Sequence, residues 1–173
     1  MPMSGTRKRK PSRAPSRLMQ NPMGPRRALH QPAKLALTVQ YGTRSTQIPS
    51  RANFTKWVRA AITKSARLTL RVVGAREARL LNHHYRGRAY ATNVLTFVYS
   101  ARPLEGDIAI CAPVVAREAK RRGVSRDAHF AHLTVHGALH LQGHDHERAD
   151  EARRMERLEA RILARLGFGD PYH

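Results

Sequence analysis

The stretch at residues 68–73, Leu-Thr-Leu-Arg-Val-Val, alternates apolar and polar side chains in the manner of a β-strand with one buried face. An earlier stretch at residues 35–41, Leu-Ala-Leu-Thr-Val-Gln-Tyr, has the same alternation. Between the two, Pro49 and Ser50 suit the start of a helix, and apolar residues recur at helical spacing over residues 54–62. The fold therefore opens with a strand, a helix and a second strand.

A second helix is expected at residues 75–85. Its apolar face is predicted to contain Ala78, Leu80 and Leu81. Gly87 is a suitable ending residue, because glycine readily adopts the left-handed conformation found after many helices.

Two short apolar stretches follow, at residues 94–99 and 106–111. Pro103 and Gly106 separate them, and the short separation predicts that they pair as a hairpin. Helix-starting and helix-ending residues then predict three helices, at residues 113–123, 125–142 and 147–166. The order β-α-β-α-β-β-α-α-α predicts a single α/β domain of the α+β type, with a four-stranded mixed sheet covered by about five helices.

Positive charge is concentrated in the first part of the chain. The net charge is +20, and residues 1–76 contain 17 Lys and Arg and no acidic residue, whereas residues 77–173 contain 15 basic and 12 acidic residues. Such a charge attracts polyanions, which favours nucleic acid as a partner. Residues 1–34 are basic, rich in Pro and without apolar periodicity. We expect a disordered tail there, with an organelle transit peptide as the alternative, in front of a folded domain at residues 35–173.

The cysteine content and the hydropathy pattern indicate the compartment. The single cysteine, Cys111, cannot form an internal disulfide, which is typical of a reducing compartment. No stretch approaches the ~20 apolar residues of a membrane-spanning helix, and the N-terminus lacks the apolar centre of a secretory signal. We therefore expect a cytoplasmic protein with no membrane association.

Six of the ten histidines lie within residues 129–146. His136 and His140 are four residues apart, so a helix would place both on one face, where they could bind one metal ion. Gly143 can end this helix and let the chain return His146 as a third ligand. Three protein ligands with one open position are typical of a catalytic zinc ion, which lowers the pKa of a bound water to ~7.

Alternatives to this site stay open. His132, one turn earlier on the same helix, could replace His140. Zinc metalloproteases carry a Glu directly after the first histidine, as the general base, and Gly137 stands at that position, which disfavours a peptidase. Asp145 or Glu147 could orient a water molecule instead, or could serve as helix-start residues.

The string His136-Gly-Ala-Leu-His-Leu-Gln-Gly-His-Asp-His146 resembles the signature of the YbeY family of bacterial endoribonucleases and rRNA maturation factors. Residues 81–88, 91–97 and 106–110 resemble further motifs of this family in the same order, so the resemblance covers about residues 35–171. The chain departs from the family pattern at positions that include Asn93 for Asp, Thr96 for Ser, Val98 for Pro and His144 for Tyr, none of them an expected ligand.

The resemblance implies one zinc ion bound by His136, His140 and His146. It implies Arg86 and His140 as catalytic residues, and Arg86 with Arg88 as RNA-binding residues, since a guanidinium can hold a phosphate through two hydrogen bonds. It further implies cleavage of single-stranded RNA in 16S rRNA 3′-end maturation and ribosome quality control, with the ribosome or small-subunit proteins as further partners. The alternative function is a zinc-stabilised ribosome-assembly factor that binds RNA without cutting it.

Overall fold

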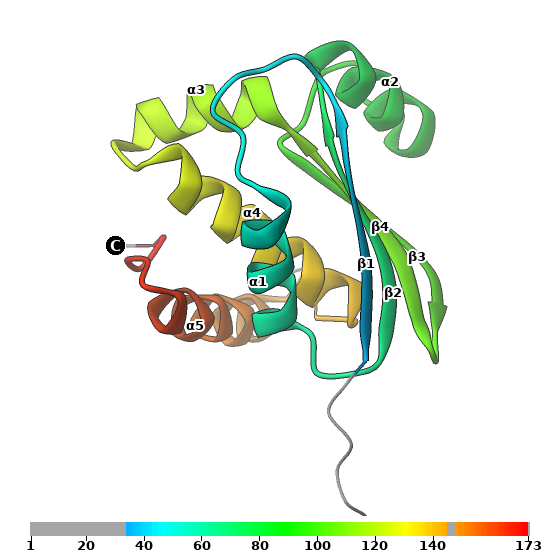
Figure 1. The fold of residues 1–173 in the computed structure, drawn as a ribbon, viewed down its shortest axis with the longest axis vertical. Coiled ribbons are helices and arrows are strands. Elements are labelled where there is room, and N and C mark those ends of the chain that lie inside the picture. The colour runs from blue at the N-terminus through cyan, green and yellow to red at the C-terminus, as the bar shows by residue number, and fades with distance from the viewer. Residues whose placement is uncertain (1–33, 145–147, 173) are drawn as a thin grey trace, which may run out of the picture. The chain divides into compact units, whose positions relative to one another are not determined.

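A computed structural model describes residues 34–144 and 148–172 (Figure 1). The order of the elements is the predicted one, and the α+β fold class is confirmed. No helix of these residues is both long and apolar enough to cross a lipid bilayer. The expected tail lies outside the described residues apart from Lys34. The elements are β1 (Leu35–Gly42), α1 (Arg51–Ala61), β2 (Ala66–Val73), α2 (Ala75–Arg86), β3 (Val94–Ala101), β4 (Leu104–Cys111), α3 (Ala112–Arg122), α4 (Arg126–Leu141) and α5 (Ala149–Leu166).

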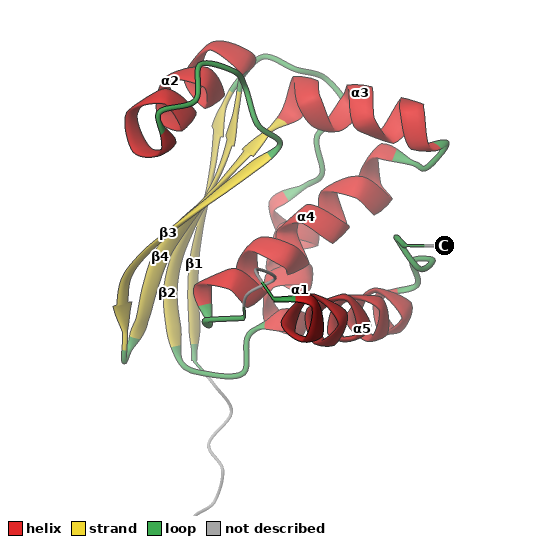
Figure 2. Ribbon diagram, turned by 180° about the vertical axis from the view of Figure 1, so that it is seen from behind, coloured by secondary structure: helices red, strands yellow, loops and turns green. Residues whose placement is uncertain are grey.

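The four strands form one mixed sheet in the order β1-β2-β4-β3. Strands β1, β2 and β4 are parallel, and β3 is antiparallel to β4, as expected for a hairpin. Strands β1 and β3 are therefore the two edges of this sheet. Figure 2 shows α1, α4 and α5 together on one side of the sheet and α2 on the other side.

The main core lies between the sheet and helices α1, α4 and α5. Alternate residues of each strand point to this side, because successive strand residues face opposite ways. The rings of Phe54 on α1 and Phe130 on α4 pack edge to face there, with centroids 5.9 Å apart. The strand residues buried on this face include Leu68, Leu70, Val72, Leu104, Ile108 and Ile110.

One local prediction is wrong, and one strand begins earlier than predicted. Leu80, predicted on the apolar face of α2, is 59% exposed, because a helix turns by about 200° between Ala78 and Leu80. The second buried residue of α2 is the polar Asn82, whose side chain donates to the carbonyl oxygen of Tyr90 at 2.9 Å. The strand predicted at residues 106–111 begins two residues earlier, at Leu104.

Helix α4 approaches the sheet closely at Gly137. A Cβ atom at this position would lie 3.1 Å from Cγ2 of Ile108 and 3.3 Å from Cγ2 of Thr96. These distances are tighter than ordinary van der Waals contact, so the absence of a side chain lets α4 cross strands β3 and β4 at short range. The residues on either side of Gly137 on the helix are thereby held near the β3 edge.

Gly106→Ala is expected to lower the free energy of unfolding by about 3 kcal/mol, the upper end of what overpacking costs. The new Cβ would lie 2.5 Å from the carbonyl oxygen of Phe97 and 2.9 Å from Cδ2 of Leu141. Gly137→Ala should cost less, because its neighbours are methyl groups that can shift. Thermal melts measure both, since each kcal/mol lowers Tm by about 2–4 °C in a chain of this size. Gly169→Ala, with open space around it, is the control, and an unchanged Tm for Gly106→Ala would contradict the prediction.

Candidate metal centre

Two of the three expected ligands lie on the last two turns of α4. Ser125 caps the start of α4, where its Oγ accepts from the N–H of Ala128 at 3.1 Å. Gln142 caps the other end, and Gly143 follows with φ of 88°. The side chain of Gln142 fixes this end. Its Oε1 accepts from the N–H of Thr63 at 3.0 Å, and its Nε2 donates to the carbonyl oxygen of Ala61 at 2.9 Å. The last turn of α4 is therefore tied to the segment that follows α1.

His136 and His140 bring two ring nitrogens together, as the four-residue spacing predicts. Their Nε2 atoms are 3.1 Å apart, their ring centroids are 4.5 Å apart, and both rings are half-buried. Two nitrogen ligands at 2.0–2.1 Å from a tetrahedral zinc ion would be separated by about 3.3 Å. The pair therefore fits two positions of one zinc ion with only a small adjustment.

Glu159 of α5 orients the ring of His136. Its Oε1 lies 2.8 Å from Nδ1 of His136. Burial raises the pKa of Glu159, but hydrogen bonds from His132 and His136 outweigh this effect and lower the pKa to about 2, so the group is an ionised acceptor. An acceptor facing Nδ1 holds the proton on that nitrogen and leaves a lone pair on Nε2. Metal-binding histidines are commonly oriented in this way by a carboxylate.

The same carboxylate belongs to an alternative set of ligands. One atom each of His132, His136 and Glu159 lies within 4.8 Å of the others, so this group could hold a metal ion. However, Nε2 of His132 lies 3.0 Å from Oε2 of Glu159, and the hydroxyl of Tyr172 also donates to that oxygen. Glu159 is fully buried and accepts from three donors, which favours a supporting role toward His136 over a ligand position open to a substrate.

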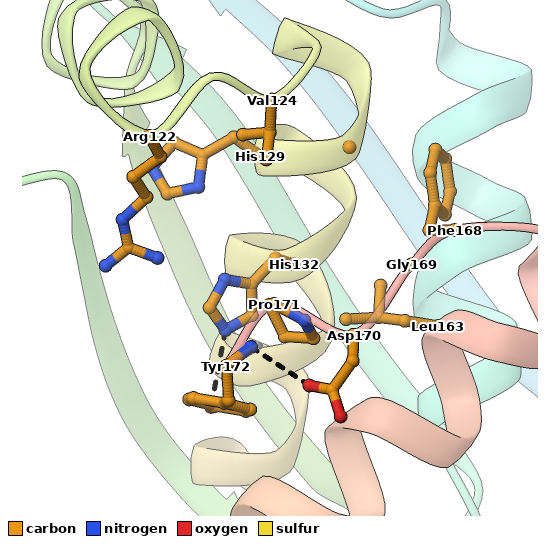
Figure 3. A pocket seen from close by; sticks show the side chains of 11 residues that line it. Arg122, Val124, His129, His132, Leu163, Phe168, Gly169, Asp170, Pro171 and Tyr172 are labelled. Atoms are coloured by element: carbon orange, nitrogen blue, oxygen red, sulfur yellow. Dashed lines mark hydrogen bonds between the residues drawn. The ribbon is translucent and has the colours of Figure 1, made fainter.

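A cavity of about 500 Å³ lies beside this cluster and is lined by His129 and His132. Figure 3 shows these two rings on α4, with Arg122 near His129 and Tyr172 near His132. Nε2 of His129 lies 2.8 Å from Oε2 of Glu118. Burial lowers the pKa of His129 by more than Glu118 raises it, so this ring is uncharged at neutral pH. His129 and His132 are thus packed neighbours of the His136 and His140 pair.

The expected third ligand, His146, lies outside the described residues, and so do Asp145 and Glu147, the acids expected to orient water. His144 is described and exposed, and its backbone N–H donates to the carbonyl oxygen of Leu139 at 3.2 Å. Its main chain therefore contributes to the end of α4. The third position of the metal site stays a prediction.

Arg86, expected to contact RNA, is the last residue of α2, and Arg88 follows two residues later. The ring of Phe97 contacts the ring of Tyr85, the neighbour of Arg86, with centroids 4.7 Å apart. Thr96 faces α4 instead, because consecutive strand residues point to opposite faces. The structure thus brings His136 and His140 together but places the end of α2 on the other face of β3. Both arginines are exposed, and their roles stay predictions.

Comparison with known proteins decides the family. The family model described as Endoribonuclease YbeY matches residues 40–167. The chain belongs to the YbeY family. Proteins named Endoribonuclease YbeY from Nitrosomonas europaea and Aromatoleum aromaticum are each 53% identical to it, over 140 and 144 residues, covering 80% and 81% of this chain and 85% and 94% of theirs. A solution structure from Thermotoga maritima, with a TM-score of 0.52 and 20% identity over 76% of this chain and 91% of that one, has the same fold.

Three positioning residues of this YbeY-family site, Glu159, Tyr172 and Gln142, were not predicted from the sequence. Glu159 carries a detectable signal. It occupies an apolar position of α5, together with Met155 and Ile162, and a carboxylate on the buried face of an amphipathic helix indicates a buried polar partner. Gln142 and Tyr172 carry no such signal, because their partners are 79 and 13 residues away in the sequence.

The two sets of ligands predict different metal-binding mutants. If Glu159 supports His136, His140→Ala removes metal binding, whereas Glu159→Gln retains it with an affinity reduced about 10-fold to 100-fold. Calorimetric titration of the stripped full-length protein with Zn²⁺ measures both. Glu156→Gln, which changes an exposed glutamate on the same helix, is the matched control. Complete loss of binding in Glu159→Gln, with normal binding in His140→Ala, would instead assign Glu159 as a ligand.

Proposed function

We propose that this chain is a single-strand-specific, zinc-dependent endoribonuclease with one Zn²⁺ ion bound by His136, His140 and His146. The proposal rests mainly on the 3.1 Å separation of the two Nε2 atoms, in a pair whose first ring is oriented by Glu159. The name shared by its relatives supports the endoribonuclease role. Imidazole donors favour zinc over Mg²⁺ and Ca²⁺, which prefer oxygen ligands.

The roles of the side chains follow from their chemistry. When bound, zinc would supply Lewis acidity toward a phosphoryl oxygen and would lower the pKa of a water molecule. Glu159 would keep the proton on Nδ1 of His136, so that this ring stays in the tautomer that can bind a metal ion. Arg86 would neutralise the phosphate, because a guanidinium donates parallel hydrogen bonds to two phosphate oxygens. Arg88 would bind a neighbouring phosphate of the same strand.

We place this activity in 16S rRNA 3′-end maturation and in ribosome quality control in the cytoplasm, with the ribosome or small-subunit proteins as further partners. The motif resemblance supports this placement. The charge supports it too, since 17 of the 20 net positive charges belong to residues 1–76. Contacts between such a segment and RNA phosphates release counterions, so binding should weaken steeply as salt increases.

A ribosome-assembly factor that is stabilised by zinc and binds RNA without cutting it is the second candidate. The contact between His136 on α4 and Glu159 on α5 favours it, because an ion on Nε2 of His136 would strengthen the hydrogen bond from Nδ1 that joins the two helices. Chelation should lower Tm under either proposal. Cleavage of RNA by the metal-loaded protein separates the two.

His140→Ala is expected to abolish cleavage of an unpaired oligoribonucleotide, because it removes a metal ligand. Arg86→Gln should lower kcat/KM roughly 100-fold, the order of effect for the loss of one charge-stabilising group. Initial rates on a labelled strand measure both effects. Arg121→Gln is the matched control, since it removes the same charge from the exposed last turn of α3. Unchanged cleavage by metal-free His140→Ala protein would refute the proposal.

A further inference from the structure

Large exposed side chains are frequent in the part of the chain that runs from α2 to β3. Among the described residues, eight large apolar or aromatic side chains are exposed, and five of them lie between residues 80 and 99. The most exposed are Tyr99 at 66% and Tyr85 at 61%. A contiguous apolar patch on a folded domain commonly marks a binding surface.

Three aromatic rings form the centre of this surface, and we call Tyr85, Phe97 and Tyr99 the tyrosine patch. The rings of Tyr85 and Phe97 are 4.7 Å apart and inclined by 58°. The hydroxyl of Tyr99 donates to Oδ2 of Asp107 at 2.7 Å, which fixes the ring. Asp107 is paired with Phe97 across the β3–β4 ladder, so the hydrogen bond from Tyr99 to Asp107 keeps the Tyr99 ring on the same face of the sheet as Phe97. The patch is therefore continuous from α2 to β3.

Cationic groups flank the tyrosine patch. Arg86 follows Tyr85 directly and is exposed. Nη1 of Arg88 lies 3.1 Å from the hydroxyl of Tyr90. The carboxylate nearest to the patch, that of Asp107, accepts the hydrogen bond from Tyr99. Exposed rings beside guanidinium groups are the combination with which proteins hold unpaired nucleotides, since bases stack on the rings and phosphates pair with the cations.

We propose that the tyrosine patch is a stacking platform for unpaired bases of an RNA strand, with Tyr85 and Tyr99 as its exposed rings. This assignment rests on the proposed endoribonuclease function and adds the means by which the chain selects unpaired RNA. Bases of a duplex are already stacked within their own helix, so they cannot stack on these rings. The platform therefore discriminates by strand state, which contacts to phosphates alone do not provide.

The position of β3 links this platform to the metal centre. Phe97 belongs to the platform, whereas the preceding Thr96 faces α4 beside Gly137, the neighbour of His136. Strand β3 is an edge of the sheet, so no further strand of the described chain lies outside it. An RNA strand stacked on the platform reaches the histidine pair by passing over this edge. The stacked bases then lie on one face of β3, and the phosphodiester to be cut lies at this edge, between Arg86 and the histidine pair.

The test is equilibrium binding of the full-length protein to a fluorescent, unpaired oligoribonucleotide whose intact length is checked after each titration. Tyr85→Leu and Tyr99→Leu are each expected to weaken binding about tenfold, the loss of one stacked base. The dependence of Kd on salt should stay unchanged, because no charge is removed. Binding of a duplex of the same length should not change.

Matched variants separate the ring from its other contacts. Tyr85→Phe and Tyr99→Phe keep the ring and should bind within twofold of the wild type, although Tyr99→Phe loses the hydrogen bond to Asp107. Tyr41→Leu changes an exposed tyrosine on β1, the opposite edge of the sheet, and should have no effect. If a leucine variant has a lowered Tm, the RNA affinity of Tyr85→Trp is measured instead. The larger tryptophan ring should bind the RNA at least as tightly as tyrosine does.

Wild-type affinity in folded leucine variants, equal losses in the phenylalanine variants, or no binding of unpaired RNA by the wild type would each overturn the platform. The two proposals can fail separately. If the wild type cuts RNA and the leucine variants bind RNA with normal affinity, only the platform is disproved. A chain that binds through these tyrosines but never cuts RNA disproves only the endoribonuclease.

Discussion

The buried carboxylate of Glu159 is the interaction on which the site depends. An ionised carboxylate without partners would cost several kcal/mol in this position, so donors have to surround it. The donors are His132 and His136 on α4 and Tyr172 near the C-terminus. One charge therefore ties α4, α5 and the C-terminal segment together, and it also sets which nitrogen of His136 faces His140. Metal binding at His136 would therefore be coupled to folding through this single group.

Close packing of α4 on the sheet is the second constraint. Gly137 has no side chain because Ile108 and Thr96 fill the space where a Cβ would lie. A glutamate at this position would point toward the sheet and not toward a metal ion at the histidine pair, so the position that carries the general base in zinc peptidases holds no acid here. The same glycine that brings α4 close to β3 thus separates this chemistry from peptide hydrolysis.

The sequence was sufficient for the elements, their order and the His136 and His140 pair, because each depends on local spacing or on turn residues such as Gly87 and Gly123. It was insufficient where a residue's role depends on a partner far along the chain. Glu159 and Gln142 act through contacts that only the tertiary structure creates. The prediction for Leu80 failed because it counted apolar residues without their angles around the helix. Leu80 lies about 200° from Ala78 and so cannot share its buried face. The motif at residues 81–88 likewise did not show against which face of β3 the end of α2 lies.

The distribution of charge explains why aromatic contacts would matter on this fold. Residues 77–173 carry 15 basic and 12 acidic side chains, so the part of the chain with the histidines and the end of α2 is close to neutral overall. Long-range attraction of RNA must come mainly from residues 1–76, and it does not distinguish paired from unpaired strands. Discrimination then requires short-range contacts with the bases themselves. The exposed rings on β3 and α2 provide such contacts at the edge of the sheet, next to the strand that packs against the metal-binding helix.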